Sequence, residues 1–96
     1  MVGVASVCLE IYVEKGCHAC RRSLALAAEV QRRFPEVPVR VVDISSGGGR
    51  HRRLITATPT FILNGTTFSL GNPSAAELER AISRLLSGSE GDESLV

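Results

Sequence analysis

Several features that would assign the chain to a specialised class are missing from its sequence. The formal net charge is only +1 over 96 residues. A chain without a strong basic excess has no electrostatic reason to bind nucleic acid, so we expect no nucleic-acid partner. No apolar run approaches the roughly 20 residues that a transmembrane helix needs, so we expect no membrane partner either.

The N-terminal residues also lack the pattern of a secretory signal. Residues 1–13 contain no basic segment, and Glu10 interrupts their apolar stretch. We therefore expect a cytoplasmic protein, in a compartment where structural disulfides are rare. Three cysteines, at positions 8, 17 and 20, are too few for a disulfide framework. The close pair with one cysteine left over favours redox chemistry or metal binding.

The length and composition are those of one ordinary globular domain. The chain is 44% hydrophobic and 22% charged, which is neither a disordered nor a membrane composition. We predict a single domain over residues 1–88. Residues 89–96 include Glu90, Asp92 and Glu93 and are predicted to form a disordered acidic tail.

The first half of the chain has the pattern of a strand, a helix and a second strand. Apolar residues alternate from Val7 to Val13, which predicts a strand with Cys8, Glu10 and Tyr12 on one face. From His18 to Phe34 the apolar period becomes helical. The β-branched stretch from Val39 to Ile44 predicts a second strand. Such a unit requires a parallel pair of strands with a right-handed crossover.

The second half predicts a hairpin and a final helix. Thr60 to Leu63 and Thr66 to Leu70 are predicted strands, joined by the strong turn signal Asn64-Gly65. Ser74 and Glu77 have the spacing of a capping box at the start of a helix.

That final helix is predicted to end at Gly88, and a short helix is predicted from Arg50 to Ile55. The fold class is therefore α/β, with the order β-α-β-(α)-β-β-α. We predict a four-stranded mixed sheet with helices on both faces. The two long helices cover one face, and the short segment covers the other.

The chemistry is expected at Cys17-His18-Ala19-Cys20, where the first strand gives way to the first helix. A thiolate at a helix N-terminus is stabilised by the positive end of the helix dipole, so we expect a lowered pKa for Cys17. Residues three apart on a helix are neighbours, so Cys20 can close a disulfide with Cys17 and reopen it. Positive charge on His18 and Arg21 is expected to tune that equilibrium.

We therefore predict thiol–disulfide exchange, with Cys17 as the nucleophile, Cys20 as the resolving cysteine and no cofactor. An alternative class is a module that binds a metal or an iron–sulfur cluster. A structural zinc site needs four ligands, and the other candidates are Cys8, His18 and His51. We expect Cys8 to be buried on its strand. For Arg50, His51, Arg52 and Arg53 we expect a solvated face rather than a site for an anionic partner.

Three separated motifs together resemble the thioredoxin-like superfamily, in its minimal, glutaredoxin-sized form. They are Cys17-His18-Ala19-Cys20 after a strand, Thr58-Pro59-Thr60-Phe61 before a strand, and Leu63-Asn64-Gly65 at the hairpin. The resemblance implies a thioredoxin-like fold, a cis peptide bond at Pro59 and a substrate strand pairing with the backbone of Thr58. It implies an oxidoreductase whose partner is a disulfide-containing protein or a small thiol such as glutathione. We expect a monomer.

Two differences accompany the resemblance. Ile11 stands where thioredoxins have a buried aspartate, and the Gly-Gly-x-Asp stretch of glutaredoxins is missing after the hairpin. A redox-inert scaffold with the same fold is therefore a third hypothesis, in which the cysteine pair never cycles.

Overall fold

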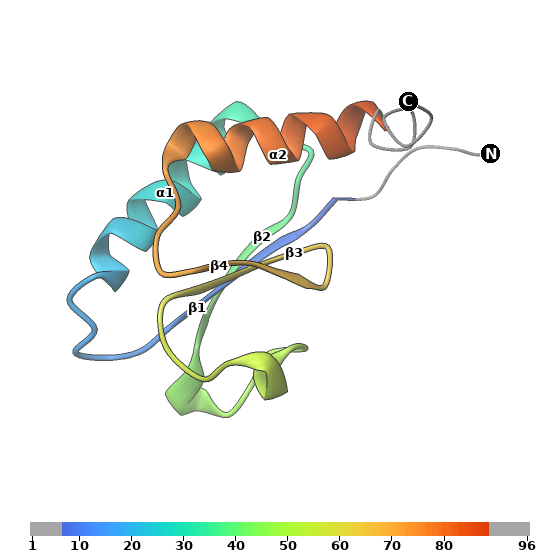
Figure 1. The fold of residues 1–96 in the computed structure, drawn as a ribbon. Helices are drawn as coiled ribbons and strands as arrows, with labels where there is room; N and C mark the ends of the chain where they lie inside the picture. Colours follow the sequence, from blue (N-terminus) through green and yellow to red (C-terminus); the bar gives the residue numbers. More distant parts are fainter. Residues whose placement is uncertain (1–6, 89–96) are drawn as a thin grey trace.

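The computed structural model describes residues 7–88, which form one four-stranded sheet with two helices (Figure 1). The strands lie in the order β2-β1-β3-β4. β1 pairs in parallel with β2 and antiparallel with β3, and β3 pairs antiparallel with β4. The elements are β1 (Leu9–Val13), α1 (Cys20–Arg33), β2 (Val39–Asp43), η1 (Ile44–Ser46), η2 (Arg52–Leu54), β3 (Thr60–Leu63), β4 (Thr66–Leu70) and α2 (Ala75–Ser87). The predicted tail, residues 89–96, lies outside the described residues.

The main core lies between the sheet and the two long helices, which share one face of the sheet in Figure 1. Because side chains alternate along a strand, Leu9 and Ile11 of β1 both point into this core. The core residues from the other elements are Phe61 and Leu63 of β3, Leu26, Ala27 and Val30 of α1, and Leu78 and Ile82 of α2. These residues of α1 and α2 form the buried faces of the two helices.

A smaller core lies on the opposite face, where Tyr12, Ile55 and Ile62 pack together. Figure 1 shows η2 beneath this face of the sheet. The predicted four-stranded mixed sheet with helical segments on both faces is confirmed. The short helix expected from Arg50 to Ile55 is a 3₁₀ turn covering only Arg52–Leu54.

The turn and cap signals also form as predicted. Asn64 and Gly65 have φ angles of 52° and 82°, the left-handed conformations that a tight hairpin turn needs. The amide of Glu77 donates to Oγ of Ser74 at 3.0 Å, and the amide of Ser74 donates to Oε1 of Glu77 at 3.2 Å. These two bonds complete the predicted capping box of α2.

Two expectations about the first strand and helix are wrong. α1 begins at Cys20 rather than His18, because Ala19 is its N-cap and residues 17–19 form a turn before it. Cys8 is half-buried rather than buried. It precedes the first residue of β1, where its amide and carbonyl are hydrogen-bonded by Asn64 of the hairpin turn.

Neither α1 nor α2 has the length and apolar character to cross a lipid bilayer, and no other helix between residues 7 and 88 does.

Candidate redox site

Cys17 and Cys20 form a disulfide at the start of α1. The amide of Cys20 donates to the carbonyl of Cys17 at 3.2 Å, which closes the turn and places the two Cα atoms 5.3 Å apart. That separation is typical of an ordinary disulfide. The two cysteines differ in exposure, because Cys20 is 6% exposed and Cys17 is only partly buried. Cys17 is thus the more accessible residue of the pair.

A shallow groove of about 460 Å³ lies beside Cys17. Its lining residues are Glu14, Lys15, Gly16, Cys17, His18, Ala19 and Thr58. The fold therefore brings Cys17, His18 and Thr58 to one groove although 41 positions separate Cys17 from Thr58. The groove lining does not include Pro59, which is buried and follows Thr58 through a cis peptide bond. Arg21 is exposed on the first turn of α1 and lies outside the groove lining.

Glu14 links the two sides of this groove. Oγ1 of Thr58 donates a hydrogen bond to Oε1 of Glu14 at 2.8 Å, and the amide of Cys17 donates to the carbonyl of Glu14 at 3.2 Å. Sequence reasoning missed Glu14, because its only signal is its place between a strand and the cysteine motif. The structure places Glu14 in the groove lining together with Cys17.

The arrangement of strands, helices and cysteine pair has counterparts among solved structures. A thioredoxin of Fasciola hepatica matches with a TM-score of 0.67 at 20% identity, over 85% of this chain and 83% of that one. A malaria-parasite thioredoxin-2 matches with a TM-score of 0.70 at 21% identity, over 82% of each chain. Mitochondrial thioredoxin 3 of Saccharomyces cerevisiae matches at 0.66 and 21%, over 83% and 79%.

The chain has the thioredoxin fold. No protein-family model and no curated protein sequence matches it. Identities near one fifth establish a shared fold and leave the activity to be argued from this chain's own residues.

Within the thioredoxin fold, the loop between β4 and α2 contacts both the segment of Thr58 and Pro59 and the turn between the cysteines. The amide of Gly71 donates to the carbonyl of Pro59 at 2.8 Å. Nδ2 of Asn72 donates to the carbonyl of Ala19 at 2.9 Å, and Oγ of Ser23 donates to Oδ1 of Asn72 at 2.6 Å. No local pattern singles out Asn72, because its partners lie about fifty positions earlier in the chain.

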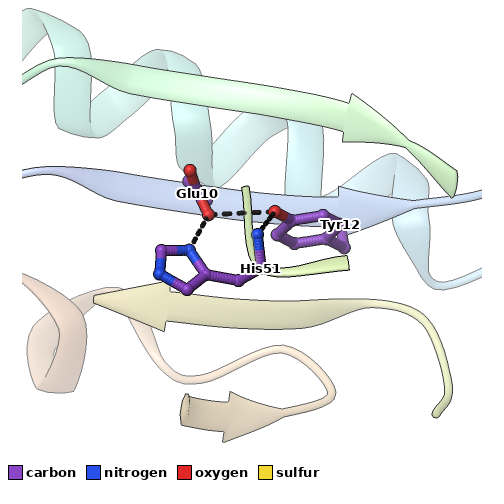
Figure 2. A network of polar contacts seen from close by, with 3 residues as sticks. All are labelled: Glu10, Tyr12 and His51. Atoms are coloured by element: carbon purple, nitrogen blue, oxygen red, sulfur yellow. Dashed lines mark hydrogen bonds and ion pairs between the residues drawn. The ribbon is translucent and has the colours of Figure 1, made fainter. Parts of the chain in front are cut away.

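A buried polar network lies on the sheet face opposite the long helices (Figure 2). Oε1 of Glu10 accepts hydrogen bonds from the hydroxyl of Tyr12 at 3.0 Å and contacts Nδ1 of His51 at 2.6 Å. The amide of His51 in turn donates to the hydroxyl of Tyr12 at 2.8 Å. Glu10 is 5% exposed and Tyr12 is fully buried. The expectation of a solvated face is therefore wrong for His51, which turns inward to pair with Glu10.

This network holds the segment that precedes Thr58 and Pro59 against the sheet. Burial and the hydrogen bond to Glu10 raise the pKa of Tyr12, so its phenol stays protonated, as its donor role requires. Gly49 fits closely over the same ring, because a Cβ there would lie 2.5 Å from Cε2 of Tyr12. Its φ of +105° is also one that side chains other than glycine's rarely adopt.

The same contacts bear on the metal-binding hypothesis. Between residues 7 and 88, no three side chains from His, Cys, Asp and Glu converge in a way that could hold a metal ion. Of the extra ligands considered, His51 has Nδ1 engaged by Glu10.

Proposed function

We propose that this chain is a thiol–disulfide oxidoreductase that exchanges the Cys17–Cys20 pair with disulfides of other molecules. The observation that carries the proposal is a disulfide at the head of α1 whose more exposed cysteine, Cys17, lines a groove together with Thr58. The thioredoxin fold supports it by analogy.

The difference in exposure supports the proposed roles of the two cysteines. An incoming disulfide can reach Cys17, whereas Cys20 is 6% exposed and serves as the resolving thiol. The first turn of α1, all of it described, contains no acidic residue, and Ala19 offers no side-chain cap. The positive end of the helix is thus not neutralised from within the helix, which favours a thiolate at Cys17. His18 and Arg21 are exposed nearby, where positive charge would act in the same direction.

The exchange takes place in two balanced steps. In the reduced protein, the Cys17 thiolate attacks one sulfur of the partner's disulfide, forms a mixed disulfide and releases the other partner sulfur as a thiolate. Cys20 then loses its proton and attacks Sγ of Cys17, which breaks the mixed disulfide. The second partner sulfur leaves as a thiolate. The protein is now oxidised, with a disulfide between Cys17 and Cys20. Two electrons pass to the partner, and the reverse sequence oxidises a partner dithiol.

Thr58 provides a surface for the partner chain. Within residues 7–88 it is hydrogen-bonded through its side chain alone, which leaves its backbone amide and carbonyl for an added strand. Pro59 follows Thr58 directly and precedes β3. We infer that Thr58 and Pro59 form the substrate-binding edge, and that the partner is a disulfide-containing protein or a small thiol such as glutathione. We expect the protein to act as a cytoplasmic monomer.

Capture of mixed disulfides tests the proposal. All variants carry Cys8→Ser, because half-buried Cys8 is a free thiol that could react on its own. The reduced Cys20→Ser variant should accumulate a mixed disulfide on Cys17 when mixed with a disulfide-bonded peptide. The matched Cys17→Ser variant should capture little, because its remaining thiol is shielded. If Cys17→Ser captures the peptide and Cys20→Ser does not, the assignment of the nucleophile is wrong.

A further inference from the structure

The loop from Gly71 to Asn72 joins two parts of the site that the chain forms separately. The amide of Gly71 donates a hydrogen bond to the carbonyl of Pro59. The side chain of Asn72 donates a hydrogen bond to the carbonyl of Ala19, in the turn between the cysteines. We propose that Asn72 is a positioning residue that holds the Cys17–Cys20 turn in its disulfide-closed shape and so sets the pair's redox equilibrium. This inference rests on the proposed function.

The contacts of Asn72 use both ends of its amide. Its Oδ1 accepts from Oγ of Ser23, and its Nδ2 donates to the carbonyl of Ala19. Ser23 is fully buried on the core side of α1, so it gives Asn72 a fixed anchor. The same Ala19 carbonyl also accepts from the amide of Arg22 at 3.2 Å. Asn72 therefore fixes a peptide group that lies between the two cysteines in sequence.

The position of that peptide group matters for the equilibrium between dithiol and disulfide. The disulfide itself constrains the turn in the oxidised state. In the reduced state no covalent bond constrains the turn. The side-chain amide of Asn72 then becomes a main restraint on the turn from outside the helix. A restrained turn keeps Sγ of Cys20 near Sγ of Cys17, which raises their effective concentration and favours ring closure. Loss of the restraint should therefore make the disulfide easier to reduce.

Ser74→Ala provides a matched control on the same loop. It removes the cap of α2 while leaving every contact of the thiol site in place. Both Ser74→Ala and Asn72→Ala should lower stability, since each removes hydrogen bonds of the loop. If Asn72 is a positioning residue, Asn72→Ala should also change the equilibrium between the dithiol and disulfide forms of the Cys17–Cys20 pair. Ser74→Ala should not change that equilibrium.

The experiment measures the equilibrium constant between the Cys17–Cys20 pair and glutathione redox buffers, in the Cys8→Ser background. Asn72→Ala should lower the constant for disulfide formation about three- to tenfold, where tenfold corresponds to about 30 mV. Ser74→Ala should leave it within about twofold of the parent. An Asn72→Ala value within twofold of the parent would overturn the proposal.

Asn72→Asp separates the two bonds. A carboxylate can still accept from Ser23, but it cannot donate to the carbonyl of Ala19 and would repel that oxygen. The equilibrium constant for disulfide formation should therefore fall at least as far as in Asn72→Ala. An unchanged constant would contradict the proposed positioning role of Asn72. If the parent protein itself does not equilibrate with glutathione, the proposed function fails instead, and the two failures are thereby distinguished.

Discussion

Replacing Tyr12 with phenylalanine removes one oxygen atom from the network of Glu10, Tyr12 and His51. The ring is retained, so its packing against Ile55 and Ile62 should remain. Two hydrogen bonds are lost, one donated to Glu10 at 3.0 Å and one accepted from the amide of His51 at 2.8 Å. Glu10 keeps its contact with Nδ1 of His51, but the amide of His51 loses its partner.

The structure allows the cost to be worked out. Leaving the part-buried amide of His51 unpaired costs about 1–2 kcal/mol, and losing a bond to a Glu10 oxygen that keeps another partner costs about 1 kcal/mol. The free energy of unfolding should therefore fall by about 2–3 kcal/mol. In a domain of this size, that corresponds to a decrease in Tm of roughly 10–20 °C.

Urea denaturation of the oxidised protein near neutral pH measures this difference. Ser45→Ala is a suitable control, because it removes a hydrogen bond to Asp43 of 2.6 Å in the same connection, but an exposed one. The control should change the free energy of unfolding by less than about 1 kcal/mol. A Tyr12→Phe cost no larger than that of the control would show that the network contributes little and would refute the reasoning.

The pH dependence gives an independent check on the same residue. Burial raises the pKa of Tyr12 above its ordinary value of 10.0. The stabilisation from the protonated phenol is therefore fully present below pH 10 and is lost as the pH rises through the higher folded pKa. The parent should lose stability in that alkaline range, whereas Tyr12→Phe should not lose this component. Parallel pH profiles for the two proteins would contradict the assignment.

Three further predictions concern other parts of the chain. Gly49→Ala should destabilise the protein by about 2 kcal/mol or more, because its Cβ would meet the Tyr12 ring and its φ is positive; thermal unfolding tests this, and an unchanged Tm would exclude the close fit. Leu78→Ala should lower the free energy of unfolding by about 2–5 kcal/mol in denaturant unfolding, because Leu78 is fully buried. A decrease smaller than that of Leu70→Ala, at an exposed position, would contradict the described core. Glu14→Gln should lower the pKa of Cys17, since it removes a negative charge from the groove. The rate of Cys17 alkylation as a function of pH, in the Cys8→Ser/Cys20→Ser protein, measures this pKa. A raised pKa would show that Glu14 does not act on the thiolate through its charge.

Local patterns predicted most of the fold. The alternation along β1, the turn at Asn64-Gly65 and the capping box at Ser74 each depend on residues close together in sequence. Those signals place the strands and helices correctly and locate the cysteine motif at the junction of β1 and α1. Two errors lie at element ends, where α1 starts at Cys20 and Cys8 lies just outside β1. The other two lie in the connection after β2, where a 3₁₀ turn replaces the expected helix and His51 turns inward.

Contacts between distant segments could not be predicted in the same way. Glu10 fits the polar phase of a strand, so its pattern looks like that of a residue facing solvent. Only the path of the connection after β2 brings His51, 41 positions later, into contact with it. Asn72 is equally ordinary in sequence and gains its place because α1 and the loop before α2 meet. Glu14 reaches Thr58 by the same kind of long-range approach.

The most direct test of the central claim is a mass-spectrometric time course of the fully reduced protein mixed with oxidised glutathione. We predict a transient adduct of one glutathione on Cys17, which gives way to the Cys17–Cys20 disulfide. The time course uses the Cys8→Ser protein, because Cys8 is a free, half-buried thiol. The proposed exchange is contradicted if Cys17 and Cys20 both stay reduced, or if the first adduct forms on Cys20.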